Sequence, residues 1–137
     1  MIKRIHQKLS AGRGHPVYHD ADQTLLAFQR QFLRKIGVSE RSAAIFDISG
    51  RSMEPLLHDG AVGLINMNVD RSTLIDGKPY AFICADECMV KTLFKRADGT
   101  LLAHSENPDK ETYPDFVIDG NGGFQLLGRV MWEGRVV

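Results

Sequence analysis

The sequence has few cysteines and no excess of charge of either sign. Cys84 and Cys88 are the only cysteines in 137 residues, too few for a domain held together by disulfides. Lysine and arginine together number 17, as do aspartate and glutamate, so the formal net charge is zero. Proteins that grip a phosphate backbone do so with clustered positive charge, and this chain is therefore not expected to bind nucleic acid by itself.

Long apolar runs are also missing from the sequence. No stretch approaches the roughly 18 apolar residues that span a bilayer, and no basic leader runs into an apolar segment with a small-residue cleavage site. We therefore expect a cytoplasmic protein that makes no use of a membrane. Hydrophobic residues make up 43% of the chain and charged residues 25%, the balance of one ordinary globular domain.

The first part of the chain predicts a linker followed by a helix. Residues 1–20 contain glycine and proline without a sustained hydrophobic period, which indicates a flexible or extended lead-in. The domain is expected to span residues 21–137. It begins with a helix over 23–36, where apolar side chains recur at three- and four-residue spacing. Asp22 is a suitable N-cap for this helix, and Gly37 a suitable stop after it.

From residue 43 onward, the sequence has the pattern of short strands separated by turns. Alternating apolar residues and turn dipeptides predict strands over 43–49, 61–67, 79–85, 88–96, 100–104 and 124–137. Asp86 and Glu87 are expected to form the turn of a hairpin. Many short strands after one amphipathic helix indicate a mostly β domain with a curled or partly closed sheet.

The stretch GRSME, residues 50–54, places a serine on a tight turn just before a predicted strand. Serine is a favoured N-cap, so Ser52 could cap a short helical turn over residues 53–57. It could also be a nucleophile, which needs a base and donors for an oxyanion. None of the five histidines lies in a hydrolase signature, and Glu54 breaks the G-x-S-x-G pattern.

A lysine can act as the base if an apolar environment keeps its amine neutral. Lys91 is a candidate because strand alternation places it on one face of the strand 88–96 together with Met89 and Leu93. The ordinary alternative is an edge-strand lysine that faces water.

Five elements occur in one order along the chain: GRSMEPLLHDG, the tyrosine strand of DGKPYAF, MVKTLFKR, SENP and LLGRVMWEGR. Over residues 45–135 the chain resembles the C-terminal domain of LexA and phage CI repressors, the S24 self-cleaving peptidases. The resemblance implies a LexA/signal-peptidase-like β fold with Ser52 as nucleophile and Lys91 as general base. It also implies an oxyanion site made by the backbone N–H groups of Arg51 and Ser52. Arg51 departs from the small or acidic residue of many relatives, which leaves room for retuned activity.

The resemblance also implies a scissile bond. Members of the family cut their own chain in a linker before the domain, usually at Ala-Gly, and this sequence has one such pair, Ala11-Gly12. The docked linker would cover Lys91, expel water and let the neutral amine take the proton of Ser52. An activator would act by shifting the linker between exposed and docked states, and in the family this activator is the RecA–single-stranded DNA filament.

Partners follow from the same resemblance. It implies a homodimer that reaches operator DNA only through an N-terminal helix-turn-helix domain, for which the residues before Gly12 leave no room. We expect a repressor fragment that begins in the linker. A naturally short UmuD-like mutagenesis protein and a catalytically idle dimerisation module are the alternatives. A type I signal peptidase, which has a similar dyad, is disfavoured because the sequence shows no membrane anchor.

Other features have simpler interpretations. Two cysteines are too few for a zinc site, so Cys84 and Cys88 are interpreted as structural, and no metal or cofactor is expected. His58 and Asp59 neighbour the serine's own turn and are not expected to complete a triad with it. The strand that contains Trp132 is expected to supply core or a dimer face.

Overall fold

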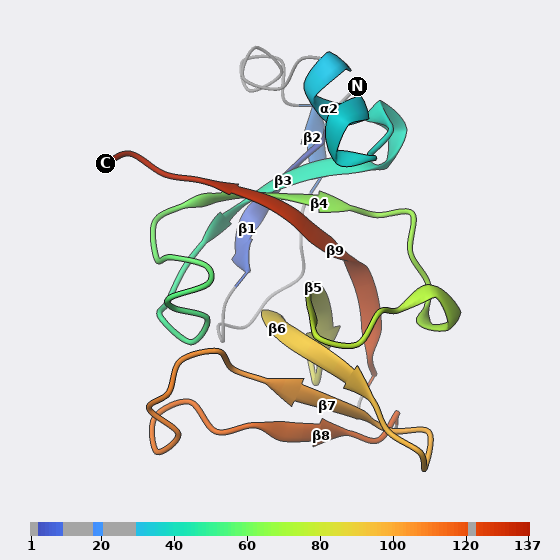
Figure 1. Cartoon of the computed structure of the whole chain (residues 1–137), viewed down its shortest axis with the longest axis vertical. Coiled ribbons are helices and arrows are strands. Elements are labelled where there is room, and N and C mark those ends of the chain that lie inside the picture. The colour runs from blue at the N-terminus through green and yellow to red at the C-terminus, as the bar shows by residue number, and fades with distance from the viewer. Residues whose placement is uncertain (1–2, 10–17, 21–29, 121–122) are drawn as a thin grey trace.

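The structure is a computed structural model that describes residues 3–9, 18–20, 30–120 and 123–137. These residues form one α-helix, α2 (Arg30–Ile36), two 3₁₀ turns, η1 (Glu40–Ser42) and η2 (Arg71–Thr73), and nine strands (Figure 1). The strands are β1 (Lys3–Leu9), β2 (Tyr18–Asp20), β3 (Ala43–Ile48), β4 (Val62–Asn66), β5 (Lys78–Cys84), β6 (Glu87–Lys95), β7 (Leu101–His104), β8 (Phe116–Ile118) and β9 (Gln125–Gly134).

The described strands form one sheet in the order β2-β1-β3-β4-β9-β5-β6-β7-β8. Neighbours are antiparallel except β1 and β3, which run parallel. The long strand β9 lies at the centre and pairs with β4 over its last part and with β5 over its first (Figure 1). Its register shifts against both partners, and such bulges bend a strand and increase its twist. Among the described residues β2 and β8 remain as edges, which confirms a mostly β domain with a curled sheet that does not close.

Alternation along β6 divides its side chains between two apolar clusters on opposite faces of the sheet. Cys88 and Val90 belong to the cluster that contains Phe46, whereas Met89 and Leu93 belong to the cluster that contains Leu101. Side chains of a strand point alternately to its two faces, so Lys91 lies on the face of Met89 and Leu93. Met89 and Lys91 also line the same cavity, in agreement with the predicted face for this lysine.

The described part of the predicted helix packs on the sheet through its apolar face. Leu33 is buried, and the Phe32 ring meets Trp132 of β9 edge to face, with ring centroids 5.8 Å apart. The helix ends where predicted, because Gly37 adopts a φ of +81° and its N–H donates to the Arg34 carbonyl at 3.2 Å. Asp22 and the first turns of the predicted helix lie outside the described residues.

The sequence located six strands to within one or two residues, except at the chain's end, and missed three. Within the predicted linker, β1 and β2 are strands paired with the sheet of the domain, and β8 was predicted as part of no strand. The hairpin turn is Ala85–Asp86 rather than Asp86–Glu87, because both former residues have positive φ, 50° and 64°. Two such residues give the turn type whose twist matches a hairpin. In the described part of the chain no helix has the length and apolar character needed to cross a membrane.

Candidate active site

The turn that carries Ser52 follows β3 and is closed at its base by hydrogen bonds. Gly50 has a φ of +91°, which lets the chain turn sharply after the strand. Its N–H donates to Asp59 Oδ1 at 2.8 Å, and the Gly60 N–H donates to the carbonyl of Ile48 at 2.9 Å. The residue pair Asp59-Gly60 therefore fixes both ends of the turn.

Ser52 is not a helix cap. Residues 51–57 form successive turns rather than a helix, anchored in the core by the buried side chains of Met53 and Leu57. The Ser52 hydroxyl makes no hydrogen bond to any other residue that the structure describes. The backbone N–H groups of Arg51 and Ser52 likewise find no acceptor within the described ranges. One hydroxyl and two amide donors on this turn are therefore available to a ligand.

Lys91 is a buried lysine rather than an edge-strand lysine facing water. It lies in the middle of β6, opposite Tyr80 of β5, and only 6% of its surface is exposed. Burial, the largest cause, and the nearby Lys110 together lower its pKa to about 8, against the opposing effect of Asp115. About a tenth of Lys91 is consequently a neutral amine at pH 7, where an ordinary lysine is almost fully protonated.

Ser52 and Lys91 line the same cavity, which has a volume of about 300 Å³. The wall is completed by Ser49, Gly50, Arg51, Glu87, Met89, Ser105, Thr112, Tyr113, Pro114 and Phe116. The cavity is thus lined by residues of the turn after β3, of strand β6 and of the segment between β7 and β8. It combines a hydroxyl, an amine with a lowered pKa and free backbone donors, which are the groups that acyl transfer requires.

The segment between β7 and β8 contributes groups that the sequence did not single out. Ser105 is 1% exposed, and its hydroxyl, in the cavity wall, has no hydrogen-bond partner among the described residues. Asn107 Nδ2 donates to the Arg51 carbonyl at 2.8 Å, and its backbone N–H donates to the Ser52 carbonyl at 2.9 Å. Asn107 and the serine turn are more than fifty residues apart in the chain, so no local sequence pattern could have predicted this contact.

A charged cluster on the same segment stands beside Lys91. Lys110 Nζ donates to the Ser105 carbonyl and, at 2.9 Å, to Asp115 Oδ1. His104 Nδ1 lies 2.9 Å from Asp115 Oδ2. Although burial raises the pKa of Asp115, hydrogen bonds from His104 and Lys110 outweigh it and lower the value to about 2. Asp115 is therefore a fixed carboxylate that holds Lys110 in place.

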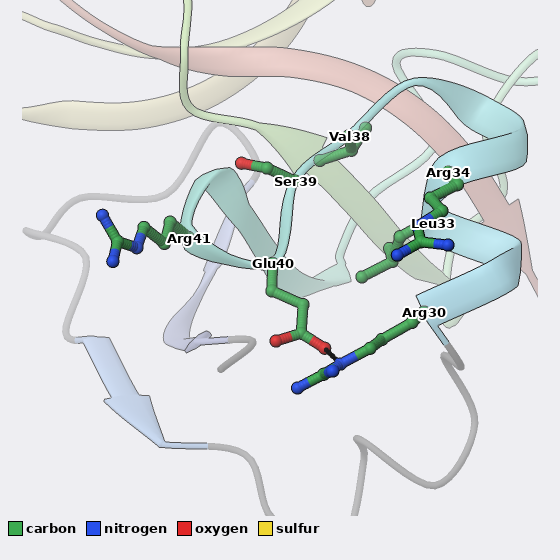
Figure 2. Close-up of a pocket in the computed structure, with 7 residues that line it drawn as sticks. All are labelled: Arg30, Leu33, Arg34, Val38, Ser39, Glu40 and Arg41. Carbon is green, nitrogen blue, oxygen red and sulfur yellow. Dashed lines mark hydrogen bonds and ion pairs between the residues drawn. The ribbon is translucent and has the colours of Figure 1, made fainter.

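A second hollow of about 430 Å³ lies between α2 and η1 (Figure 2). It is lined by Arg30, Leu33, Arg34, Val38, Ser39, Glu40 and Arg41. Figure 2 shows Arg30 and Glu40 turned toward one another, with Arg30 Nε 2.7 Å from Glu40 Oε1. This pair is exposed on the arginine side, and Ser39, which supplies the only hydroxyl among the described residues of the lining, donates to Ser42 Oγ at 3.0 Å.

The remaining candidates lie apart from this chemistry. His58 Nδ1 is 2.9 Å from Glu133 Oε1, and Asp59 accepts the Gly50 N–H, so neither extends a triad toward Ser52. Cys84 and Cys88 belong to clusters on opposite faces of the sheet, and burial raises the pKa of both thiols. The predicted scissile pair, Ala11-Gly12, lies outside the described residues.

Comparison with known proteins shows the family of the chain. The family model described as Peptidase S24-like matches residues 3–131. The chain belongs to the Peptidase S24-like family. Among S24 relatives, the repressor protein CI of Enterobacteria phage phi80 is 30% identical over 133 residues, covering 96% of this chain and 53% of the phage protein. The HTH-type transcriptional regulator PrtR of Pseudomonas aeruginosa is 31% identical over 133 residues, covering 94% of this chain and 50% of the regulator. The chain therefore spans about half the length of these repressor relatives.

Proposed function

We propose that this chain is the C-terminal self-cleavage and dimerisation domain of a LexA/CI-like, prophage-type transcriptional repressor. Ser52 acts as the nucleophile, Lys91 as the general base, and Ala11-Gly12 is the scissile bond. The observation that carries the proposal is the shared cavity, in which the buried Lys91 lies with Ser52. Membership of the S24 family supports the same reaction class.

The reaction follows from the groups on the cavity wall. Neutral Lys91 takes the proton of the Ser52 hydroxyl while Ser52 Oγ attacks the carbonyl carbon of Ala11. The N–H groups of Arg51 and Ser52 stabilise the resulting oxyanion. The Ala11–Gly12 bond then breaks, and the Lys91 ammonium gives its proton to the departing Gly12 amine. Water, deprotonated by Lys91, hydrolyses the Ser52 ester and frees the Ala11 carboxyl group.

The pairing of β1 with β3 supports cleavage within one chain. The two strands run parallel, with Leu9 opposite Ile48, so both lead toward the same end of the sheet (Figure 1). Ala11 follows Leu9 by two residues, a reach of at most about 7 Å, and Ser52 follows Ile48 by four residues, a reach of about 14 Å. Such reach lets the scissile segment meet the nucleophile without a second molecule, and positioning then replaces substrate affinity.

The names of the relatives supply the proposed partners. One is a phage repressor and the other an HTH-type regulator, so we propose a homodimer that binds operator DNA through a helix-turn-helix domain on the rest of the protein. The RecA–single-stranded DNA filament is the proposed activator. A UmuD-like protein and an idle dimerisation module remain the alternatives. An active site is favoured because the Ser52 hydroxyl, without a partner among the described residues, lines the same cavity as an amine with a lowered pKa.

The test is to incubate the purified chain near pH 7 and near pH 10 and to follow its intact mass. We expect a new species that begins at Gly12, forms faster at high pH, and is absent from the Ser52→Ala and Lys91→Ala variants. An intact wild-type chain at every pH would favour the dimerisation module.

A further inference from the structure

The turn after β7 contacts both sides of the cavity through three consecutive residues. Ser105 lines the cavity itself. The Glu106 carboxylate accepts a 2.7 Å hydrogen bond from the hydroxyl of Thr92, the neighbour of Lys91 on β6. Asn107 reaches in the other direction, to the turn that carries Ser52. This short turn therefore connects the base strand with the nucleophile turn.

Asn107 is held at both ends of its side chain. Its Nδ2 donates to the Arg51 carbonyl at 2.8 Å, while its Oδ1 accepts the N–H of Asp109 at 3.0 Å. Its own backbone N–H donates to the Ser52 carbonyl at 2.9 Å. Two consecutive carbonyls of the nucleophile turn thus accept hydrogen bonds from one residue of a distant loop, and the Arg51 carbonyl also accepts the Glu54 N–H at 3.2 Å.

Because the peptide bond is planar, the hydrogen bond from Asn107 to the Arg51 carbonyl also determines where the Ser52 N–H points. In a trans peptide, the N–H points opposite to the C=O of the same unit. The Arg51 carbonyl points toward Asn107, so the Ser52 N–H must point away from Asn107. That N–H has no acceptor among the described residues and belongs to a residue of the cavity wall.

We propose that Asn107 is a positioning residue, which orients the Ser52 N–H as an oxyanion donor and holds the nucleophile turn in its reactive geometry. This inference rests on the proposed function, because it assumes that Ser52 is the nucleophile. Asn107 acts through Arg51 and Ser52 and does not itself touch the reacting atoms.

The experiment compares self-cleavage of the wild-type chain and the Asn107→Ala variant between about pH 6 and pH 10. We expect the plateau rate to fall roughly 10- to 100-fold, somewhat less than the loss of an oxyanion donor itself. The pH midpoint should not move, because the substitution removes no charge near Lys91. A variant with merely loosened packing would instead cleave at the wild-type rate whenever it is folded.

Asn66→Ala is the matched control. Asn66 is also partly buried, and its Oδ1 also accepts the N–H of the residue two positions on, Asn68, at 2.9 Å. It lies at the end of β4 and does not line the cavity. Asn66→Ala therefore loses the same kind of local contact as Asn107→Ala but no contact to the nucleophile turn. It should cleave at the wild-type rate.

Asn107→Asp is a second variant, which keeps the size and the Oδ1 acceptor but loses the donor to the Arg51 carbonyl. It should be at least as slow at its plateau as the alanine variant, and circular dichroism would verify that both are folded. Wild-type rates in folded Asn107→Ala and Asn107→Asp would overturn the inference and leave the proposed function intact.

Covalent labelling of Ser52 by diisopropyl fluorophosphate separates the inference from self-cleavage, because labelling does not need the scissile segment. If the wild-type chain is labelled but does not cut itself, the proposed function fails. The role of Asn107 is then tested by comparing the labelling rates of the wild-type chain and Asn107→Ala. Slower labelling of Asn107→Ala would support its role, and equal labelling would refute it. A wild-type chain that neither cuts nor labels would overturn both.

Discussion

The two hollows of this molecule differ in what surrounds their charges. The hollow between α2 and η1 is the larger, at about 430 Å³, but its ion pair, Arg30 with Glu40, is exposed on the arginine side. The cavity beside Ser52 is smaller, at about 300 Å³. It is lined by Lys91, which is 6% exposed, and by Ser105, whose buried hydroxyl has no partner among the described residues. Volume alone would select the wrong site.

The difference between the hollows indicates which of them lowers the stability of the fold for the sake of function. Burial of an amine or a hydroxyl without a partner is unfavourable, and native proteins accept it mainly where the group has a task. An exposed ion pair contributes little to stability and requires no functional explanation. The following four predictions exploit this contrast, from the largest expected effect to the smallest.

Substitutions in the two hollows should have opposite consequences for cleavage. Ser52→Ala and Lys91→Ala remove the nucleophile and the base, so each should reduce the self-cleavage rate by at least about 10³-fold. Arg34→Ala, in the larger hollow, should leave the rate unchanged. Intact-mass kinetics measures all three, and a comparable loss in Arg34→Ala would remove the distinction between the hollows.

Replacement of the buried amine should stabilise the fold. In a Ser52→Ala background, Lys91→Met should raise the free energy of unfolding near pH 7 by on the order of 3 kcal/mol, because folding lowers the lysine pKa from 10.5 to about 8. The unfolded chain binds more protons at Lys91 between these two pH values. The free energy of unfolding of the protein with Lys91 therefore rises between about pH 8 and pH 10.5. Its gap to the free energy of unfolding of the Lys91→Met variant narrows over the same range.

Urea denaturation of both proteins between about pH 7 and pH 10 measures this difference. Other ionisable groups are common to the two proteins and cancel in the comparison. A difference that stays constant with pH would mean that Lys91 is not desolvated in the folded state.

The charges beside Lys91 should shift the pH dependence in opposite directions. Lys110→Met removes a positive charge that favours the neutral amine, so the midpoint of the pH–rate profile should rise by about half a pH unit. Asp115→Asn removes a negative charge that favours the ammonium, so the midpoint should fall. Lys78→Met, at the exposed start of β5, is the control and should leave the midpoint unchanged. Shifts of the same sign in both variants would contradict the electrostatic explanation.

The exposed ion pair should matter least. Arg30→Ala and Glu40→Ala each break the 2.7 Å contact, yet cleavage should proceed at the wild-type rate, and stability should change less than in any variant above. Thermal unfolding and intact-mass kinetics on the two single variants and the double variant provide the measurement. Slower cleavage in these variants would show that the hollow between α2 and η1 is energetically coupled to the cavity beside Ser52.

The sequence predicted those parts of the site that depend on local pattern. Period-two alternation placed Lys91 on the face of Met89 and Leu93, and the Asp59-Gly60 dipeptide marked the end of the serine turn. The curled β fold followed from strand lengths and turn signals. What set Ser52 apart from a helix cap was the family resemblance rather than the turn itself.

Other parts depend on contacts that no local pattern records. Asn107 and Ser105 lie in a polar loop without periodicity, and their roles come from segments far away in the chain. The parallel pairing of β1 with β3 joins regions more than thirty residues apart. The turn at Ala85–Asp86 was misplaced by one residue because alanine is not favoured at positive φ, and the hairpin geometry overrides that preference.

The pH dependence of self-cleavage tests most directly whether a buried, neutral Lys91 activates Ser52. Intact mass of the wild-type chain would be followed from about pH 6 to pH 11, with Lys91→Ala alongside. We predict a product that begins at Gly12 and a rate that rises about tenfold per pH unit before it levels off near pH 8, the pKa of the buried amine. A rate that shows no such rise, or that keeps increasing to the ordinary lysine pKa of 10.5, would contradict this role for Lys91.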